Sequence, residues 1–130
     1  MSPALLNAAL WSGLLIFVMI VLSLRVILGR WQHRVSLGEG LEGQLSVAAR
    51  SFGNCAEYVP GIAAMTLVAL VGASTVEVNV IGGTLLLGRV LHPLGLMMKA
   101  PNWARLIGMV LTLFALGFAA VLLIMATMVA

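Results

Sequence analysis

Apolar residues fill four long stretches of the chain, at residues 3–29, 44–71, 80–98 and 103–129. Polar or glycine-rich segments separate them, at residues 30–43, 72–79 and 99–102. A helix needs roughly 20 predominantly apolar residues to cross a bilayer, and each stretch reaches or approaches that length. The pattern therefore predicts an all-α integral membrane fold, a bundle of four transmembrane helices.

The composition supports the same class. With 62% hydrophobic and only 8% charged residues, the 130-residue chain lies far from the composition of a soluble domain. Four spans leave no room for a soluble domain, so we expect one transmembrane domain over residues 1–130. The first stretch has no basic segment before it and stays apolar past Leu24, which favours a retained helix over a cleaved signal peptide.

Basic residues gather around two of the three connections, those at 30–43 and 99–102. By the positive-inside rule we expect both to face the cytoplasm, and both termini to lie on the other side. Topology thus explains the net charge of +3, and basic residues scattered among apolar spans do not indicate nucleic-acid binding. The residues concerned are Arg25, Arg30, Arg34, Lys99 and Arg105.

The second apolar stretch carries ionisable groups inside a segment that otherwise reads as membrane-spanning. On a helix, a spacing of i, i+4, i+7, i+8 and i+11 places five residues on one face: Arg50, Asn54, Glu57, Tyr58 and Gly61. A charged side chain at membrane depth costs at least ~2.5 kcal/mol, so this face should meet the protein interior, a partner subunit or a wet cavity. Pro60 removes one helical N–H there, and we expect a bend.

The predicted spans contain more buried cations than anions. Glu57 is the one acid within them, whereas Arg50 and Arg89 both lie in spans and Arg105 begins the last one. A planar guanidinium binds carboxylate or phosphate in a bidentate manner, so the imbalance favours an anionic ligand. The alternative is an Arg50–Glu57 ion pair, linked to Arg89, that only specifies helix packing.

Other site chemistries find little support in the sequence. Two histidines and a single cysteine, Cys55, do not indicate a metal site, and a thiol in an apolar helix is usually inert. His92 lies one turn after Arg89 and is uninformative alone. Residues 38–43 match the G-x-G-x-x-G pattern, but a spanning helix rather than a strand precedes them, so we interpret them as a loop.

The motifs resemble those of the MAPEG family, the membrane-associated proteins in eicosanoid and glutathione metabolism. Its R-x-x-x-N-x-x-E pattern appears as Arg50, Asn54 and Glu57, followed by Pro60. The segment Arg89-Val-Leu-His92 and an arginine at the start of the last helix, Arg105, match as well. The resemblance covers nearly the whole chain.

The resemblance implies a homotrimer of four-helix subunits that binds glutathione, as co-substrate, between neighbouring subunits near the cytoplasmic side. Arg105 would stabilise the thiolate, which attacks a hydrophobic electrophile arriving from the bilayer. The candidate glutathione-binding residues are Arg50, Asn54, Glu57, Tyr58, Arg89 and His92.

Three departures from the prostaglandin-synthase-like members change this picture. Leu96 replaces a tyrosine, Leu106 replaces a serine, and Ser46-Val47 replaces a Glu-Arg pair. Thiol activation would therefore rest on Arg105 alone. The sequence looks like a bacterial-type branch of the family, and we expect the bacterial inner membrane as its location.

Three functions remain open at this level. The first is a glutathione transferase or peroxidase acting on hydrophobic electrophiles, and the second is a non-catalytic scaffold that binds lipid or glutathione. The third is a structural protein or small transporter subunit in which Arg50 and Glu57 only lock the bundle. Arg105 discriminates the first two, because catalysis requires it to face the ligand cavity.

Overall fold

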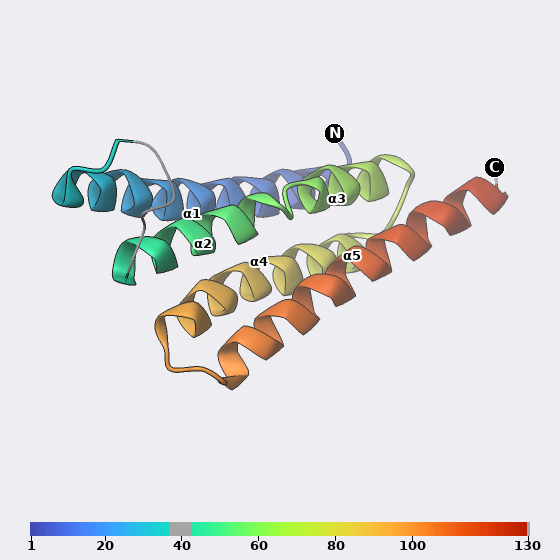
Figure 1. Cartoon of the computed structure of the whole chain (residues 1–130). Coiled ribbons are helices and arrows are strands. Elements are labelled where there is room, and N and C mark those ends of the chain that lie inside the picture. The colour runs from blue at the N-terminus through green and yellow to red at the C-terminus, as the bar shows by residue number, and fades with distance from the viewer. Residues whose placement is uncertain (37–42, 130) are drawn as a thin grey trace.

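The computed structural model describes residues 1–36 and 43–129, so the loop predicted at 38–43 lies largely outside the described residues. The described chain is entirely helical apart from turns, as the hydropathy pattern predicts. Its helices are α1 (Pro3–His33), α2 (Gly43–Ala56), α3 (Pro60–Leu70), α4 (Thr75–Met97) and α5 (Trp103–Val129) (Figure 1).

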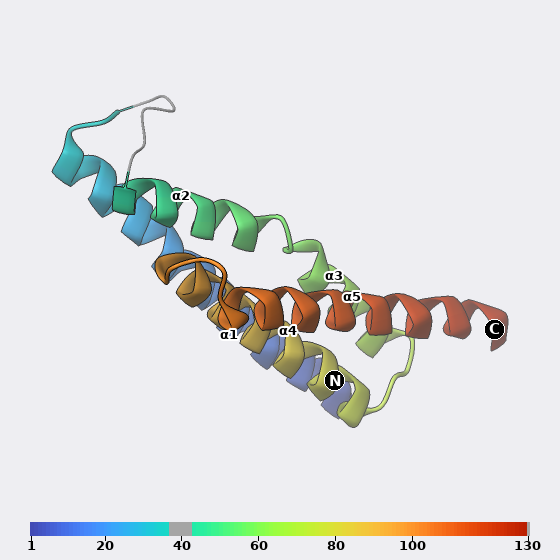
Figure 2. The same ribbon diagram turned by 60° about the horizontal axis from the view of Figure 1, so that its bottom comes forward.

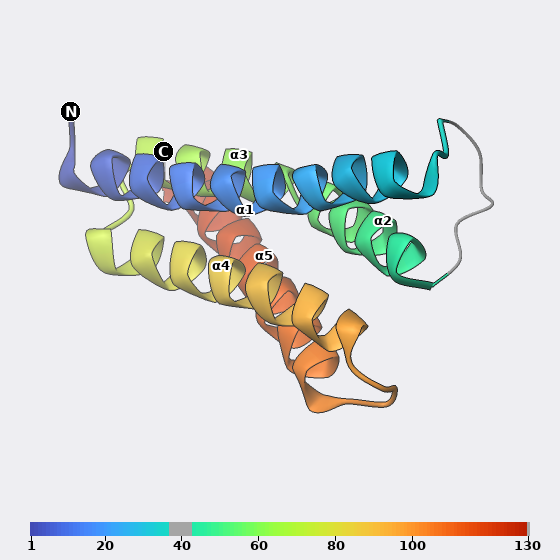
Figure 3. The same cartoon turned by 90° about the vertical axis from the view of Figure 1, so that its left-hand side faces the viewer.

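The helices form an up-and-down arrangement of four segments. Both α2 and α3 run back along α1, α4 returns beside them, and α5 packs along α4 before diverging from the other helices (Figures 1 and 2). Both chain termini and the α3–α4 turn lie at one end. The end of α1 and the α4–α5 connection lie at the other, which is therefore the basic end (Figure 3).

Within residues 1–36 and 43–129, three helices are long and apolar enough to cross a membrane: α1, α4 and α5. The prediction of one continuous second helix over residues 44–71 is wrong, because residues Glu57–Val59 form a turn between α2 and α3. Pro60 is the cause. It has no N–H to give to the carbonyl of Ala56, and its ring clashes with a helical carbonyl at that position. The predicted bend is confirmed, but it is an interruption.

The start of α4 also differs from the expectation. The sequence predicts a turn over residues 72–79 that includes Glu77, but the helix begins at Thr75. The Ser74 hydroxyl accepts a bond from the Glu77 N–H at 3.3 Å, and the Glu77 carboxylate accepts one from the Ser74 N–H at 2.7 Å. This reciprocal capping box starts the helix four residues before the end of the predicted turn.

Gly82 and Gly88 of α4 bring neighbouring helices close together. A Cβ on Gly88 would lie 2.7 Å from the carbonyl oxygen of Gly108, so α4 and α5 touch backbone to backbone. At Gly82 the ring of Trp11 occupies the space, and its Nε1 donates to Asn79 Oδ1 at 2.9 Å. Trp11 therefore joins α1 to α4. A Cβ on Gly83 would lie 3.7 Å from the Trp11 ring, so that position has room for a small side chain.

Candidate functional site

Arg89 of α4 is the most deeply buried charged residue in the described chain, with 2% of its surface exposed. Its guanidinium makes five hydrogen bonds, one for each N–H it carries. Thr112 Oγ1 accepts from Nε at 3.0 Å and from Nη2 at 2.6 Å, and the Gly108 carbonyl accepts from Nη2 at 3.5 Å. Asn54 Oδ1 accepts from Nη1 at 2.9 Å.

The fifth bond depends on the break between α2 and α3. In a continuous helix the Asn54 carbonyl would accept from the Tyr58 N–H, but that N–H bonds to the Cys55 carbonyl at 3.2 Å instead. The Asn54 carbonyl is left for Arg89 Nη1, at 3.3 Å. The Tyr58 ring covers the same guanidinium, with its centroid 4.4 Å from Cζ. Arg89 thus ties α2, α4 and α5 together.

No carboxylate of the described residues lies within 4.0 Å of the Arg89 guanidinium, which neutral oxygens and an aromatic face surround. The charge is therefore spread over polar groups instead of being paired. The hydrogen bonds of Arg89 connect neighbouring helices. The alternative interpretation of the sequence gave that role to an Arg50–Glu57 ion pair. Arg50 and Glu57 themselves are exposed, and they do not pair with each other.

His92 lies one turn beyond Arg89 on α4, with 3% of its surface exposed. Its Nδ1 is buried and has no hydrogen-bond partner among the described residues. A buried polar atom without a hydrogen-bond partner costs roughly 1–3 kcal/mol of stability, so its presence in a native protein requires an explanation. His92 also lines a cavity of about 410 Å³ together with Asn102, Arg105, Leu106 and Met109.

This cavity lies at the beginning of α5. Asn102 Oδ1 accepts from the Arg105 N–H at 3.0 Å, and Asn102 Nδ2 donates to the Gly95 carbonyl at 2.7 Å, so Asn102 fixes the helix start against the end of α4. Arg105 is exposed at the cavity wall. Its guanidinium and the start of a 27-residue helix both favour a negative charge in the cavity.

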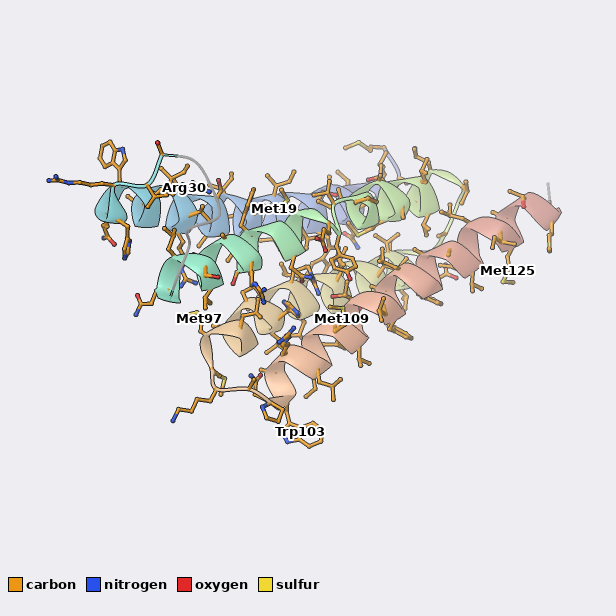
Figure 4. All side chains as sticks on the ribbon, viewed as in Figure 1. Met19, Arg30, Met97, Trp103, Met109 and Met125 are labelled. Carbon is orange, nitrogen blue, oxygen red and sulfur yellow. The ribbon has the colours of Figure 1, made fainter. Side chains whose placement is uncertain are left out.

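The predicted site residues fall into three groups. Arg89, Asn54 and Tyr58 meet in the interior, and Met109 joins that cluster to the cavity because the Tyr58 hydroxyl donates to its sulfur at 3.4 Å. Figure 4 shows nitrogen-bearing side chains gathered between α2, α4 and α5 near Met109. His92 and Arg105 share the cavity, and Arg50 and Glu57 lie on the surface of the single chain, away from its lining.

Sequence reasoning missed two polar residues of this region, Thr112 and Asn102. Thr112 is completely buried, and it is the lone hydroxyl in the first two-thirds of an otherwise apolar α5. An isolated threonine in such a helix was the available signal. Asn102 directly precedes the helix and is a preferred N-cap residue. Cys55 is buried, in keeping with the expectation of an inert thiol.

Comparison with known proteins agrees with the motifs. The MAPEG family model matches residues 8–125. The inner membrane protein YecN of Escherichia coli strain K12 is 34% identical over 99 residues, which cover 75% of this chain and 76% of YecN. YecN of Escherichia coli O6:H1 strain CFT073 matches with the same values. No solved structure matches. The chain is therefore a membrane protein that belongs to the MAPEG family.

Proposed function

We propose that this protein is a membrane-bound, glutathione-dependent transferase or peroxidase that acts on hydrophobic electrophiles as a homotrimer. The observation that carries the proposal is the cavity of about 410 Å³ in which Arg105, the start of α5 and the buried His92 converge. Positive potential and an orphaned ring nitrogen are what an anionic thiol ligand needs. We place this basic end of the bundle at the cytoplasmic face, in the bacterial inner membrane.

Glutathione offers this cavity two carboxylates and a thiol. A guanidinium beside the thiol lowers its pKa and stabilises the thiolate, which is the nucleophile, so Arg105 is the proposed catalytic residue. In transfer, the thiolate sulfur bonds to the electrophilic carbon while the leaving group departs with the displaced electron pair. In the peroxidase reaction, two glutathione molecules reduce a lipid hydroperoxide to an alcohol and water, and become the disulfide.

The buried network has a supporting role in this proposal. Arg89 donates its N–H groups to Asn54, Thr112 and Gly108 and lies against the Tyr58 ring, and so it holds Asn54 and Tyr58 in place beside the site. Direct contact between Arg89 and glutathione stays an expectation from the family resemblance.

Two exposed charges favour the trimer. Arg50 lies in α2 and Glu57 in the turn that follows it, and both are exposed on the single chain within an otherwise apolar bundle. Charges at such depth need a protein or ligand partner. In the proposed homotrimer, α2 and the turn after it present both side chains to the cavity of the neighbouring subunit, where they complete the glutathione site.

A non-catalytic scaffold of the same family is the second candidate. Leu106 lines the cavity and Leu96 is half-buried at the end of α4, so neither position supplies a hydroxyl to the thiol. A site that holds glutathione without ionising it would fit these side chains equally well.

The test is calorimetric titration of glutathione onto the purified protein in detergent, with thiolate ultraviolet absorbance followed in parallel. We expect saturable binding with a thiolate signal, loss of that signal in Arg105→Leu, and weaker binding in Arg50→Leu. Lys99→Leu removes one exposed charge from the same end and is the matched control. Binding without thiolate would identify the scaffold, and absence of binding by folded trimer would refute the glutathione assignment.

A further inference from the structure

A second cavity system lies on another face of the bundle, along α1. One face of α1 is formed by residues at helical spacing: Val18, Val21, Leu22, Arg25, Leu28, Gly29 and Gln32. Between α1 and α4 they border an apolar groove of about 250 Å³. Between α1 and α2 they border a polar cavity of about 200 Å³. Arg25 lines both, so it marks the point where the two meet.

The apolar groove opens toward the membrane. Phe17 of α1 and Leu94 of α4 line it and are 64% and 49% exposed on the single chain, and Val21 and Val90, which also line it, are exposed as well. From Phe17 to Arg25 the groove follows α1 for eight residues, or ~12 Å at 1.5 Å per residue. One leaflet of hydrocarbon is ~15 Å thick, so the groove spans most of a leaflet and ends in a positive charge.

Arg25 is poorly partnered compared with Arg89. Its Nη1 donates to the Met97 sulfur at 3.3 Å, the one hydrogen bond that the described chain gives it. A thioether is a weak acceptor, so the charge lacks the oxygen partner that a half-buried guanidinium needs. Met97, which lies at the end of α4 (Figure 4), also lines the α1–α4 groove.

The polar cavity supplies groups that suit a lipid headgroup. Gln32, His33 and Gln44 line it together with Arg25. His33 Nδ1 bonds to the Gly29 carbonyl at 2.8 Å, which directs the rest of the ring outward from α1. No aspartate or glutamate lines either cavity among the described residues. A headgroup with a quaternary amine would therefore find no anion there, whereas a phosphate with neutral hydroxyls would find donors.

We propose that this face of α1 holds one anionic phospholipid of the surrounding membrane. One acyl chain lies in the groove beside Phe17, Val21 and Leu94, the phosphate binds Arg25, and the remaining headgroup occupies the polar cavity. The site is separate from the proposed glutathione cavity, because it lies on α1 against α4 and α2 and neither His92 nor Arg105 lines it. Arg89 also lines the apolar groove, but its five N–H groups are already bonded to Asn54, Thr112 and Gly108. It does not depend on the glutathione assignment.

Native mass spectrometry of the intact protein tests this. The detergent-purified protein is incubated with equimolar phosphatidylglycerol and phosphatidylcholine of identical acyl chains, and bound lipid is counted per subunit. We expect one phosphatidylglycerol per subunit in preference to phosphatidylcholine. Arg25→Gln should lower that preference roughly fivefold, since one basic residue near a lipid headgroup contributes ~1 kcal/mol. Lys99→Gln, which removes an equal charge from the same end, should leave it unchanged.

A second variant tests the contribution of the lipid's acyl chain separately from that of the Arg25 charge. Leu94→Trp fills the groove and leaves Arg25 in place, so retention of both lipids should fall by a similar factor. Equal lipid preference in Arg25→Gln and Lys99→Gln would overturn the proposal. So would a wild-type protein that carries neither lipid, because another copy of the chain or nothing would then cover the face. Displacement of the lipid by millimolar inorganic phosphate would reduce the site to a phosphate site and overturn it too.

Discussion

Replacing Thr112 by valine tests whether the buried arginine network holds the bundle together. Valine has nearly the shape of threonine, so the substitution removes the hydroxyl and leaves little cavity. Two N–H groups of Arg89, Nε at 3.0 Å and Nη2 at 2.6 Å from Thr112 Oγ1, would lose their acceptor. The hydroxyl's own bond to the Gly108 carbonyl, at 2.8 Å, would be lost as well.

The magnitude follows from these bonds. Hydrogen bonds to charged groups contribute ~1.5–3 kcal/mol each, so two of them amount to at least ~3 kcal/mol. Side-chain bonds between membrane helices average only ~0.6 kcal/mol, which sets a floor near ~1 kcal/mol for the pair. We expect about 3 kcal/mol, because Thr112 is fully buried and water cannot replace its hydroxyl.

The assay is reversible unfolding in mixed micelles, followed by helical circular dichroism. Thr112→Ser is the matched control. It keeps the acceptor and loses one methyl group, so it should cost only ~1 kcal/mol. Arg89→Leu combined with Thr112→Val completes a double-mutant cycle, and the double variant should be less destabilised than the sum of the two single variants. If Thr112→Val is no worse than Thr112→Ser, the bonds contribute nothing and the reasoning fails.

Three further outcomes are expected from the fold. Gly88→Ala should lower the free energy of unfolding by ~2 kcal/mol or more, because its Cβ would lie 2.7 Å from the Gly108 carbonyl oxygen. Gly117→Ala is the control and should be tolerated, because no atom lies within 4 Å of its Cβ. Thermal melting compares the two variants. Pro60→Ala restores an N–H at the α2–α3 break, so amide exchange over residues 57–61 should slow; unchanged exchange would show that proline is not the cause. Ser74→Ala removes the cap of α4 and should cost ~1 kcal/mol in the same melting assay, and no loss would argue against the capping box.

The sequence was sufficient for the four helical segments because the bilayer sets their length. Long apolar stretches identify α1, α4 and α5 directly. Pro60 pointed to a bend, but how far it interrupts the helix depends on what can bond to the exposed backbone groups. The early start of α4 was readable, since Ser74 and Glu77 have the spacing of a capping box.

The site was less accessible to sequence reasoning. Apart from Arg105 and two threonines, α5 consists of apolar residues and glycine, so its sequence does not say which side meets α4, and Thr112 could not be paired with Arg89. The spacing of the second stretch placed Asn54 and Tyr58 on one face, and the family resemblance added Arg89 to the same candidate site. The structure brings these three together. Counting charges did not predict the surroundings of Arg89, because neutral oxygens of Asn54, Thr112 and Gly108 accept hydrogen bonds from all of its N–H groups.

The break between α2 and α3 and the buried Arg89 depend on each other through the Asn54 carbonyl. With Pro60 replaced, the Asn54 carbonyl would return to its helical partner and Arg89 would lose an acceptor. With Arg89 replaced, the same carbonyl would face an apolar interior with no donor, which is costly where water is absent. Replacing Pro60 or Arg89 alone would give a less stable protein. We therefore expect related proteins either to keep both residues or to have replaced both.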